Sequence, residues 1–435
     1  MTSVAESRPA AAGESSLRAV LVASFVGTAI EWYDFFLYGT AAALVFSRLF
    51  FPTVDPLIGT LSSFATFAVG FGARPLGGII FGHFGDRVGR KSMLIYSLLI
   101  MGIATFLIGL LPTYDSIGIA APILLVVLRC AQGIGVGGEW GGAVLMAVEH
   151  SPESRRGLAG ACPQMGVPAG LFLSTVVFGL VNGSMSEAQF MAWGWRIPFL
   201  LSLLLVAIGM FIRLRIVESP AFRRLQESGR TESRPLVVAV RDYRRPVLLA
   251  MGMRLAENGL FYIYTVFVLS YGPGELGVSR STMLWGVTIT ALAGLVAIPS
   301  FGALSDRIGR RPVYLFGAVF SLVYSFPFFW LLHTRSPIVI GLAILLGVAF
   351  GHDAMYGPQA AYFSELFGAS VRYSGASLAY QLASVASGGL APFIATALLA
   401  AYGTAAVAAY MMLLSAITVV AAWLAPETHR TSLAH

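Results

Sequence analysis

The sequence predicts an all-α integral membrane protein with twelve transmembrane helices, arranged as two parallel six-helix bundles related by pseudo-two-fold symmetry. Three observations support this fold class. Of the 435 residues, 57% are hydrophobic and only 11% are charged, and the mean hydropathy is +0.78; a soluble domain carries about 25% charged residues. Apolar segments of about 20 residues, long enough to cross the ~30 Å hydrocarbon core, recur along nearly the whole chain. A ten-residue motif also occurs once in each half.

The expected helices follow the apolar segments in order. They cover 19–43, 57–82, 92–112, 118–148, 157–181, 194–215, 247–271, 283–303, 312–332, 336–363, 374–398 and 402–424. The first eighteen residues are polar and lack the basic-then-apolar order of a secretory signal. The chain is therefore expected to divide into an N-terminal tail (1–18), an N-terminal bundle (19–215), a linker (216–246), a C-terminal bundle (247–424) and a C-terminal tail (425–435).

The basic residues are distributed by side of the membrane. Nearly all are arginines, since Lys91 is the only lysine, and they gather in alternate connections. The intervening connections hold little beyond Arg48, Arg280 and Arg335. By the positive-inside rule both tails and the linker are expected to be cytoplasmic. This distribution explains the net charge of +7 without a nucleic-acid partner; the expected surroundings are the lipid bilayer.

The repeated motif reads GHFGDRVGRK from Gly82 to Lys91 and GALSDRIGRR from Gly302 to Arg311, at an offset of 220 residues. Its recurrence indicates that six spans were duplicated in parallel. Its glycines allow a tight turn, and its aspartate can accept hydrogen bonds from a helix N-terminus or a nearby arginine, which predicts a gate rather than a merely charged turn. With the weaker repeats after spans four and ten, the candidate gating residues are Asp86, Arg87, Arg90, Glu149, Arg156, Asp306, Arg307, Arg310, Glu365 and Arg372.

Several charges fall inside the expected spans. A charge in the bilayer costs about 2.5–3.5 kcal/mol or more, so such residues normally face the bundle interior and pair. A rise of about 1.5 Å per residue gives Asp34 and Arg129 similar depths, with Glu31 one turn shallower. A purely structural set of ion pairs is the alternative to a functional one. The embedded charges are Glu31, Asp34, Arg74, Arg129, Glu139, Arg254, Glu257 and Asp353.

The motif, the twelve spans and the parallel halves together resemble the major facilitator superfamily. The segments EWYDFFLYG, RPLGGIIFGHFGDRVGRK, RCAQGIGVGGEWGGA and AENGLFYIYTVFVLSYG are similar to its metabolite:proton symporter branch, whose members carry shikimate, α-ketoglutarate, citrate, proline or betaine. The resemblance implies a proton-driven transporter in a bacterial inner (plasma) membrane. It also implies that Asp34 and Arg129 form the proton-coupling pair. Glu31, one helical turn from Asp34, is expected to assist. The sequence departs from the family at 368–370, where Gly-Ala-Ser replaces Pro-Thr-Arg, so Arg372 is expected to be the remaining gating partner there.

The expected solute is a small polar metabolite, with an organic acid favoured, imported by alternating access. A guanidinium binds a carboxylate through two hydrogen bonds, so Arg74 and Arg254 are the candidate anion-binding residues. For each neutral candidate an interhelical bond that holds the bundle together is an equal alternative. Because histidine is the side chain whose ordinary pKa lies near neutral pH, His352 is also a candidate for a part in proton coupling. The further candidate solute contacts are Glu139, Gln164, Asn258, Tyr262, His352, Tyr356 and Gln381.

Other functions remain as alternatives. Uptake of a zwitterionic solute such as proline or betaine is the nearest rival. A drug exporter is less favoured because span five lacks a Gly-Pro pair, and a receptor because the linker of about thirty residues is the only sizeable soluble segment. No catalytic constellation, cofactor motif or metal cluster is recognisable; the neighbouring His352 and Asp353 supply too few ligands for a metal. We expect a monomer that is not an enzyme.

Overall fold

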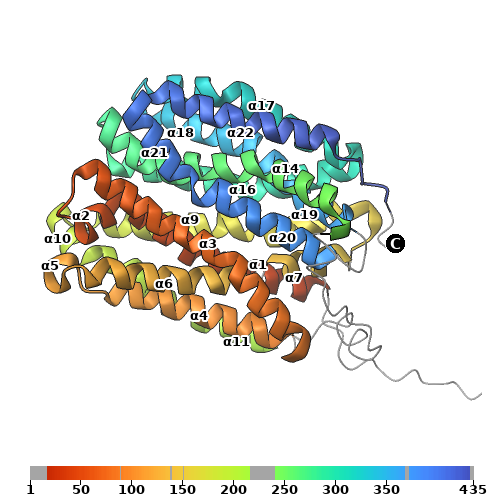
Figure 1. Cartoon of the computed structure of the whole chain (residues 1–435), viewed down its shortest axis with the longest axis horizontal. Coiled ribbons are helices and arrows are strands. Elements are labelled where there is room, and N and C mark those ends of the chain that lie inside the picture. The colour runs from red at the N-terminus through yellow and green to blue at the C-terminus, as the bar shows by residue number, and fades with distance from the viewer. Residues whose placement is uncertain are drawn as a thin grey trace, which may run out of the picture.

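The structure, a computed structural model, is an elongated bundle of helices that run roughly along one direction (Figure 1). It describes residues 17–88, 90–137, 140–149, 151–215, 241–367 and 372–431. Across these ranges the chain is helical and contains no β-strand. The N-terminal half occupies the lower part of Figure 1 and the C-terminal half the upper part.

The N-terminal half makes six passes. Short helices and turns at the ends of the passes extend or join the long ones. Its elements are α1 (Leu17–Ala41), η1 (Ala42–Phe46), α2 (Ser47–Phe50), α3 (Pro56–Val88), α4 (Arg90–Leu110), α5 (Tyr114–Ile117), α6 (Ala120–Gly137), α7 (Trp140–Glu149), η2 (Glu153–Arg155), α8 (Arg156–Gln164), α9 (Gly166–Gly183), α10 (Glu187–Ala192), η3 (Gly194–Arg196) and α11 (Ile197–Arg215).

The C-terminal half repeats the six passes. π-helical turns interrupt passes one, seven, ten and eleven of the chain. Passes one, seven and ten also carry embedded charges. Its elements are α14 (Arg244–Tyr262), η4 (Ile263–Phe267), α15 (Val268–Tyr271), η5 (Gly272–Leu276), α16 (Arg280–Ile308), α17 (Arg310–Leu332), α18 (Pro337–Leu346), η6 (Gly347–His352), α19 (Asp353–Glu365), α20 (Arg372–Ser384), η7 (Val385–Gly389), α21 (Ala391–Tyr402) and α22 (Thr404–Leu424).

The prediction of a twelve-helix membrane fold is confirmed. In the described part of the chain, nine helical stretches are long and apolar enough to span a bilayer, and a shorter apolar helix covers Ile95–Leu110 in the third pass. The other two passes are the first and the seventh, whose embedded charges lower their mean hydropathy. Leucine, isoleucine, valine and tryptophan side chains are exposed along the outer faces, as expected where lipid surrounds the bundle.

The two halves meet through a pseudo-symmetric set of helices. Pass two packs against pass eleven, through α3 with α20, η7 and α21, and pass five packs against pass eight, through α8 and α9 with α16. A parallel duplication exchanges pass two with eight and pass five with eleven, so these two contacts are equivalent. The polar groups of both halves therefore face a shared central boundary.

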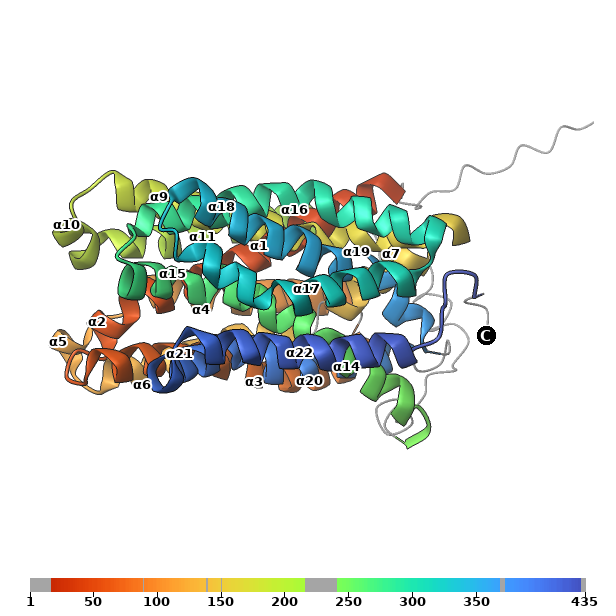
Figure 2. The same ribbon diagram turned by 90° about the horizontal axis from the view of Figure 1, so that it is seen from above.

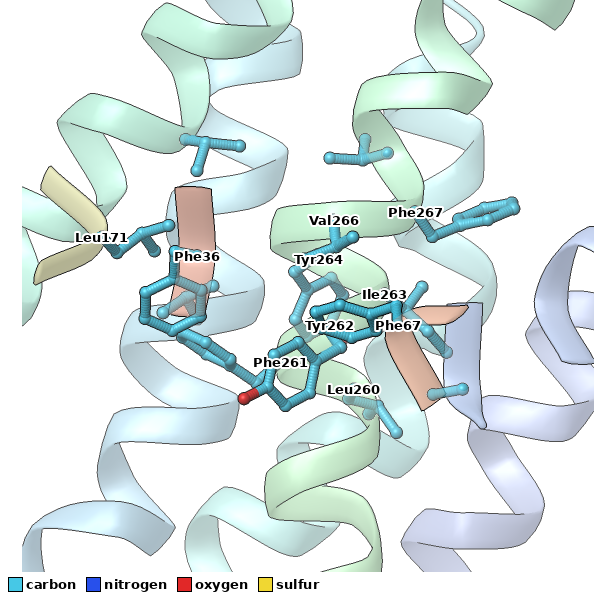
Figure 3. Close-up of a cluster of buried hydrophobic side chains, with 14 of the residues drawn as sticks. Phe36, Phe67, Leu171, Leu260, Phe261, Tyr262, Ile263, Tyr264, Val266 and Phe267 are labelled. Carbon is cyan, nitrogen blue, oxygen red and sulfur yellow. The ribbon is translucent and has the colours of Figure 1, made fainter. Parts of the chain in front are cut away.

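The two ends of the bundle differ. One end, here named the motif end, carries the Gly302–Arg311 motif and the C-terminal segment, while α2, α5 and α10 lie at the opposite end (Figure 2). Between the ends, aromatic rings fill the boundary: Phe36 contacts Phe261 and Tyr262 at centroid distances of 5.7 and 6.1 Å, and Phe67 contacts Tyr262 at 5.6 Å (Figure 3). This aromatic layer separates the polar central site from the opposite end.

Candidate functional site

A cavity lies at the boundary between the halves, on the motif side of the aromatic layer. Its volume in this conformation is about 30 Å³. Four passes of the N-terminal half and two of the C-terminal half contribute to it, so relative movement of the halves would change its shape. The lining residues are Thr28, Glu31, Trp32, Arg74, Val136, Trp140, Ala143, Val144, Pro163, Gln164, Tyr356, Tyr380 and Gln381.

Arg74 is the cationic residue of this lining. Its guanidinium lies 4.2 Å from the ring centroids of both Phe35 and Phe71 and 5.2 Å from that of Trp32. The side chain is buried, and across the described residues its Nε and Nη2 have no hydrogen-bond partner. The rings stabilise the cation through their π faces but leave the N–H groups of Nε and Nη2 available to an acceptor.

Arg129, on α6, is held by aromatic rings in a similar way. Its guanidinium lies 4.2 Å from the centroids of Phe35 and Tyr38 and 4.9 Å from that of Phe67. Its Nη1 donates to Gln132 Oε1 at 3.0 Å. Phe35 thus lies between the two embedded arginines of the N-terminal half.

Asp34 and Arg129 do not form an ion pair in this conformation, as judged over the described side chains of the two passes. Gln132 connects them indirectly, since its Nε2 donates to Thr105 Oγ1 at 2.7 Å and Thr105 lies beside Asp34. Asp34 is buried, and its Oδ1 has no hydrogen-bond partner in the part of the chain described. The pair implied by the family resemblance is therefore bridged rather than direct.

Arg254, on α14, has its hydrogen-bonding groups satisfied within the protein. Its Nη1 donates to Glu257 Oε2 at 2.7 Å and to Gln359 Oε1 at 2.9 Å, and its Nε donates to Ser384 Oγ at 2.9 Å. The ring of Tyr380 lies 3.3 Å from the guanidinium carbon and separates it from the cavity side. The guanidinium of Arg254 is thus hydrogen-bonded to other side chains of the protein, whereas Nε and Nη2 of Arg74 have no partner among the described residues.

The cavity collects part of the expected solute set. Arg74, Gln164, Tyr356 and Gln381 line it together with Glu31. Gln164 Nε2 donates to Tyr356 O at 2.5 Å and Gln381 Nε2 to Gly137 O at 3.2 Å, so both amides also join the halves. The candidates outside the lining are Arg254, Asn258, Tyr262 and His352, while Glu139 lies outside the described residues.

Three lining aromatics were not among the residues selected from sequence. Trp140 stacks on Tyr380 at a centroid distance of 3.8 Å, and Trp32 lies beside Arg74. The signal of the two tryptophans in the sequence is adjacency to an embedded charge, in Glu31-Trp32 and Glu139-Trp140, whereas Tyr380 has no such neighbour. Aromatic residues are too common in this chain for that adjacency alone to identify them.

At the motif end, Asp306 joins the two halves. Its carboxylate accepts hydrogen bonds from the backbone N–H groups of Gly157 (2.8 Å) and Leu158 (3.0 Å), at the N-terminus of α8. Arg310 Nη1 also donates to Asp306 at 2.6 Å. A carboxylate at a helix N-terminus is stabilised by the helix dipole and by otherwise unpaired N–H groups.

Arg310 extends this network within the C-terminal half. Its Nε and Nη2 donate to Glu365 Oε2 and Oε1 at 3.2 and 3.1 Å, and Thr428 Oγ1 donates to Glu365 Oε2 at 2.7 Å. Glu427 accepts from the backbone N–H groups of Arg310 (2.9 Å) and Arg311 (3.0 Å) at the start of α17. The C-terminal segment therefore takes part in the motif-end network.

The remaining gating candidates are placed differently. Arg372 Nε donates to the carbonyls of Ser364 (3.0 Å) and Phe367 (3.3 Å), while Glu365 is bound by Arg310. Arg156 donates to Thr431 O at 2.8 Å, and Arg307 is exposed. The side chains of Asp86, Arg87, Arg90 and Glu149 lie outside the described part of the structure.

The opposite end carries a wider vestibule of about 560 Å³, bordered by η1, α2, α3, α15, η5 and α16. Glu187 Oε1 lies 3.0 Å from Arg48 Nη1 and 3.3 Å from Arg280 Nη2, and so it links the halves at the surface. Deeper, Thr288 Oγ1 donates to Thr175 Oγ1 at 2.8 Å. Among the described residues, this end is joined by fewer and more exposed polar contacts than the motif end.

Two six-helix bundles around a central polar cavity define a polytopic membrane transporter. A sequence model of the Major Facilitator Superfamily matches residues 24–388 and, overlapping, 262–434. The chain belongs to the major facilitator superfamily. It is a transporter of metabolites and not an enzyme, in agreement with the expectations from sequence.

Relatives and solved structures agree with this assignment. The chain is 42% identical over 424 residues to the inner membrane metabolite transport protein YhjE of Escherichia coli (strain K12), covering 96% of each chain. It is 45% identical over 388 residues to the shikimate transporter of the same strain, covering 88% of each. The fold matches a solved structure of the proton:xylose symporter XylE, an E. coli protein, with a TM-score of 0.74 and 17% identity over 94% of this chain and 96% of that one.

Proposed function

We propose that this chain is a proton-coupled symporter that imports a small organic acid by alternating access. Arg74 carries the proposal. Its guanidinium is buried in the central cavity and, over the described residues, has two N–H-bearing nitrogens without hydrogen-bond partners. A carboxylate would accept from both and would offset the cost of the buried charge. The shikimate transporter among its relatives is named for a carboxylic acid.

Proton coupling is assigned to Asp34, assisted by Glu31 and linked to Arg129 through Thr105 and Gln132. Arg129 favours the ionised carboxylate, whereas burial favours the neutral acid. A conformational change that alters the Thr105–Gln132 bridge therefore changes proton affinity, and that is thermodynamic linkage between protonation and the direction in which the cavity opens. A structural neighbour is named a proton:xylose symporter, and this name supports the proton as the coupling ion.

The motif end is assigned to the cytoplasm, with both termini and the linker 216–246 on that side. The positive-inside rule supports this orientation. The Asp306–Arg310–Glu365 network then acts as the cytoplasmic gate, and the vestibule with Arg48 and Arg280 faces outward. The conformation described here is thus closed to the cytoplasm.

A zwitterionic solute such as betaine or proline is the second candidate. Glu31 and the aromatic rings of Trp32, Trp140 and Tyr380 line the same cavity as Arg74. Such a wall can hold a quaternary or secondary ammonium through cation–π contacts while Arg74 binds the carboxylate. These rings are the observation that supports a zwitterionic solute as the second candidate.

The solute class is tested in proteoliposomes with labelled shikimate, α-ketoglutarate, citrate, proline, betaine and xylose. The expected result is uptake of one of the organic acids, at least tenfold reduced in Arg74→Gln because a charge-assisted pair is worth about 1.5–3 kcal/mol. Arg335→Gln, which removes an exposed charge outside both the cavity and the vestibule, is the matched control. Uptake confined to betaine or proline would replace the organic-acid proposal with its rival, and uptake of neither class would contradict both.

A further inference from the structure

His352 lies between two carboxylates inside the C-terminal half. Its Nδ1 is 2.7 Å from Asp353 Oδ1, and its Nε2 is 3.1 Å from Glu257 Oε1. The three side chains are all at least 95% buried. Both ring nitrogens therefore face an acceptor oxygen at hydrogen-bond distance, and water has little access to either contact.

The number of protons follows from these two contacts. Each N···O contact needs one hydrogen to be a hydrogen bond, because ionised carboxylates only accept. A neutral imidazole carries a single N–H and can satisfy one contact. The second hydrogen must come from an added proton, which is carried either by the imidazole or by one of the two carboxyl groups. This geometry therefore corresponds to the cluster with one proton more than a neutral histidine and two carboxylates hold.

The charges around the cluster also indicate that it holds one added proton. Arg254 pairs with Glu257 at 2.7 Å, so with a neutral histidine the group of four would carry one net negative charge from Asp353. One added proton makes the buried group neutral, and neutrality lowers its cost in a low-dielectric interior. The other titratable groups around it are the buried phenols of Tyr314 on α17, Tyr356 on α19, Tyr380 on α20 and Tyr262 on α14, and the guanidinium of Arg74 on α3, which interacts with Arg254 across the boundary. From α16 and α9 come Gly294 and Pro168.

The cluster is not arranged as a metal site. The two nitrogens of His352 point to different carboxylates, so their lone pairs do not converge on one point. Among the described residues, no group of His, Cys, Asp and Glu side chains is placed to hold a metal ion. The proton is thus the ligand that this arrangement fits.

Asp353 places the cluster at the boundary between the halves. Its Oδ2 has no hydrogen-bond partner among the residues described, and it faces the point where Gly294 of α16 meets Pro168 of α9. A Cβ built on Gly294 would lie 3.0 Å from Pro168 Cβ and 3.4 Å from Asp353 Oδ2. The close approach of α9 and α16 therefore keeps this oxygen out of contact with water.

We propose that Glu257, His352 and Asp353 form a second proton-binding site, separate from Asp34, whose proton is held while α9 and α16 are in contact. When the motif end opens, α16 moves away from α8 and α9 and water reaches Asp353 Oδ2. Asp353 is then hydrated as a carboxylate, His352 becomes neutral, and the proton passes to water at that end. The direction of release rests on the proposed function, whereas the existence of the site does not.

Infrared difference spectroscopy tests the site without any solute. Purified protein with ring-labelled histidine, reconstituted in liposomes, is titrated from acidic to alkaline pH as wild type, Asp353→Asn, Asp353→Glu and Asp115→Asn. We expect wild type to hold one proton at neutral pH that appears as an imidazolium or a protonated carboxyl signal. This signal should be lost in Asp353→Asn, because an amide donates to Nδ1 and removes the need for the extra proton. It should remain in Asp353→Glu and in the exposed control Asp115→Asn.

The outcomes separate clearly. A wild-type protein with a neutral imidazole and no protonated carboxyl at neutral pH overturns the proposal, and this result needs no variant to fold. Persistence of the full signal in a monodisperse Asp353→Asn protein overturns it as well. Because no solute is present, failure here leaves the uptake proposal standing, and failure of uptake leaves this site standing.

Discussion

Asp306 of the C-terminal half caps the first turn of α8 in the N-terminal half, where its carboxylate accepts from the backbone N–H of Gly157 at 2.8 Å. The same carboxylate accepts from Arg310, which is also bound to Glu365. One side chain thus connects the contact between the halves with the charge network inside one half. Opening the motif end must break this cap.

Asp306→Asn should shift the protein toward the state that is open at the motif end. The amide keeps the size of the side chain but removes the charge that interacts with the helix N-terminus, a contact worth about 1.5–3 kcal/mol. The equilibrium should therefore move by roughly tenfold or more. Electron-paramagnetic distance distributions between labels on α8 and α16 provide the measurement, with Asp115→Asn as control. An unchanged distribution would show that the cap does not hold the closed state.

Gly302→Ala should have the same effect for a steric reason. A Cβ at Gly302 would lie 2.7 Å from Gly157 O and 2.9 Å from Ala161 Cβ, so α8 and α16 could not keep their present approach. Gly341→Ala is the matched control, because a Cβ there meets nothing within 4 Å. The same distance measurement applies. Equal distributions for the two variants would mean that the Gly157–Gly302 contact is not required for closure.

Arg254→Gln should destabilise the protein strongly, since it leaves Glu257 buried without its 2.7 Å partner. Removing one member of a buried ion pair costs about 3–5 kcal/mol, and removing both costs less. The double variant Arg254→Gln/Glu257→Gln should therefore recover part of the thermal stability in detergent. If the double variant were as unstable as the sum of the two single variants, the pair would not be coupled in the way its geometry indicates.

The contacts of Glu427 predict that the C-terminal segment attaches to the start of α17 in a pH-dependent way. Burial raises the pKa of Glu427, but the backbone N–H groups of His429, Arg310, Arg311 and Thr428 lower it by more, so the pKa lies below its usual value. A lowered pKa means that the stabilisation is present above the ordinary pKa and is lost as the pH falls through the lowered one. Glu427→Gln should therefore loosen the segment at neutral pH and have little effect in strong acid.

Limited proteolysis of the C-terminal segment across this pH range measures the effect. Asp115→Asn again serves as the control, because Asp115 lies at the opposite end. A difference between wild type and Glu427→Gln that stayed constant down to strong acid would contradict the role of the carboxylate.

The general fold follows from the sequence because hydropathy and the repeated motif are one-dimensional signals. Segment lengths locate the passes, and the offset of 220 between the two motifs relates the halves. The seventh pass begins at Arg244 rather than at 247, because its first turn contains Arg244 and Arg245 and therefore lies outside the apolar segment.

Only part of the candidate site could be predicted from the sequence. Depth along a helix can be counted, and it placed Asp34 and Arg129 at similar levels, but it does not give the direction in which a side chain points. That direction decided the outcome for Arg74 and Arg254, of which only the first lines the cavity. Neutral partners such as Gln132, Gln359 and Ser384 carry no distinctive signal until tertiary packing brings them to an arginine.

The gating network shows the same limit. Arg310 was selected from the repeated motif, yet its partnership with Glu365 joins two passes 55 residues apart in the chain. Thr428 joins them from the C-terminal segment. Such contacts depend on helix packing, which periodicity alone does not specify.

The central claim is that a proton gradient drives accumulation through Asp34. Its most direct measurement is uptake of the accepted solute into proteoliposomes with and without an imposed inward proton gradient, for wild type and Asp34→Asn. We expect wild type to accumulate solute above equilibrium only with the gradient, and Asp34→Asn to lose accumulation while retaining solute exchange. Equal gradient-driven accumulation by the two proteins would contradict the account.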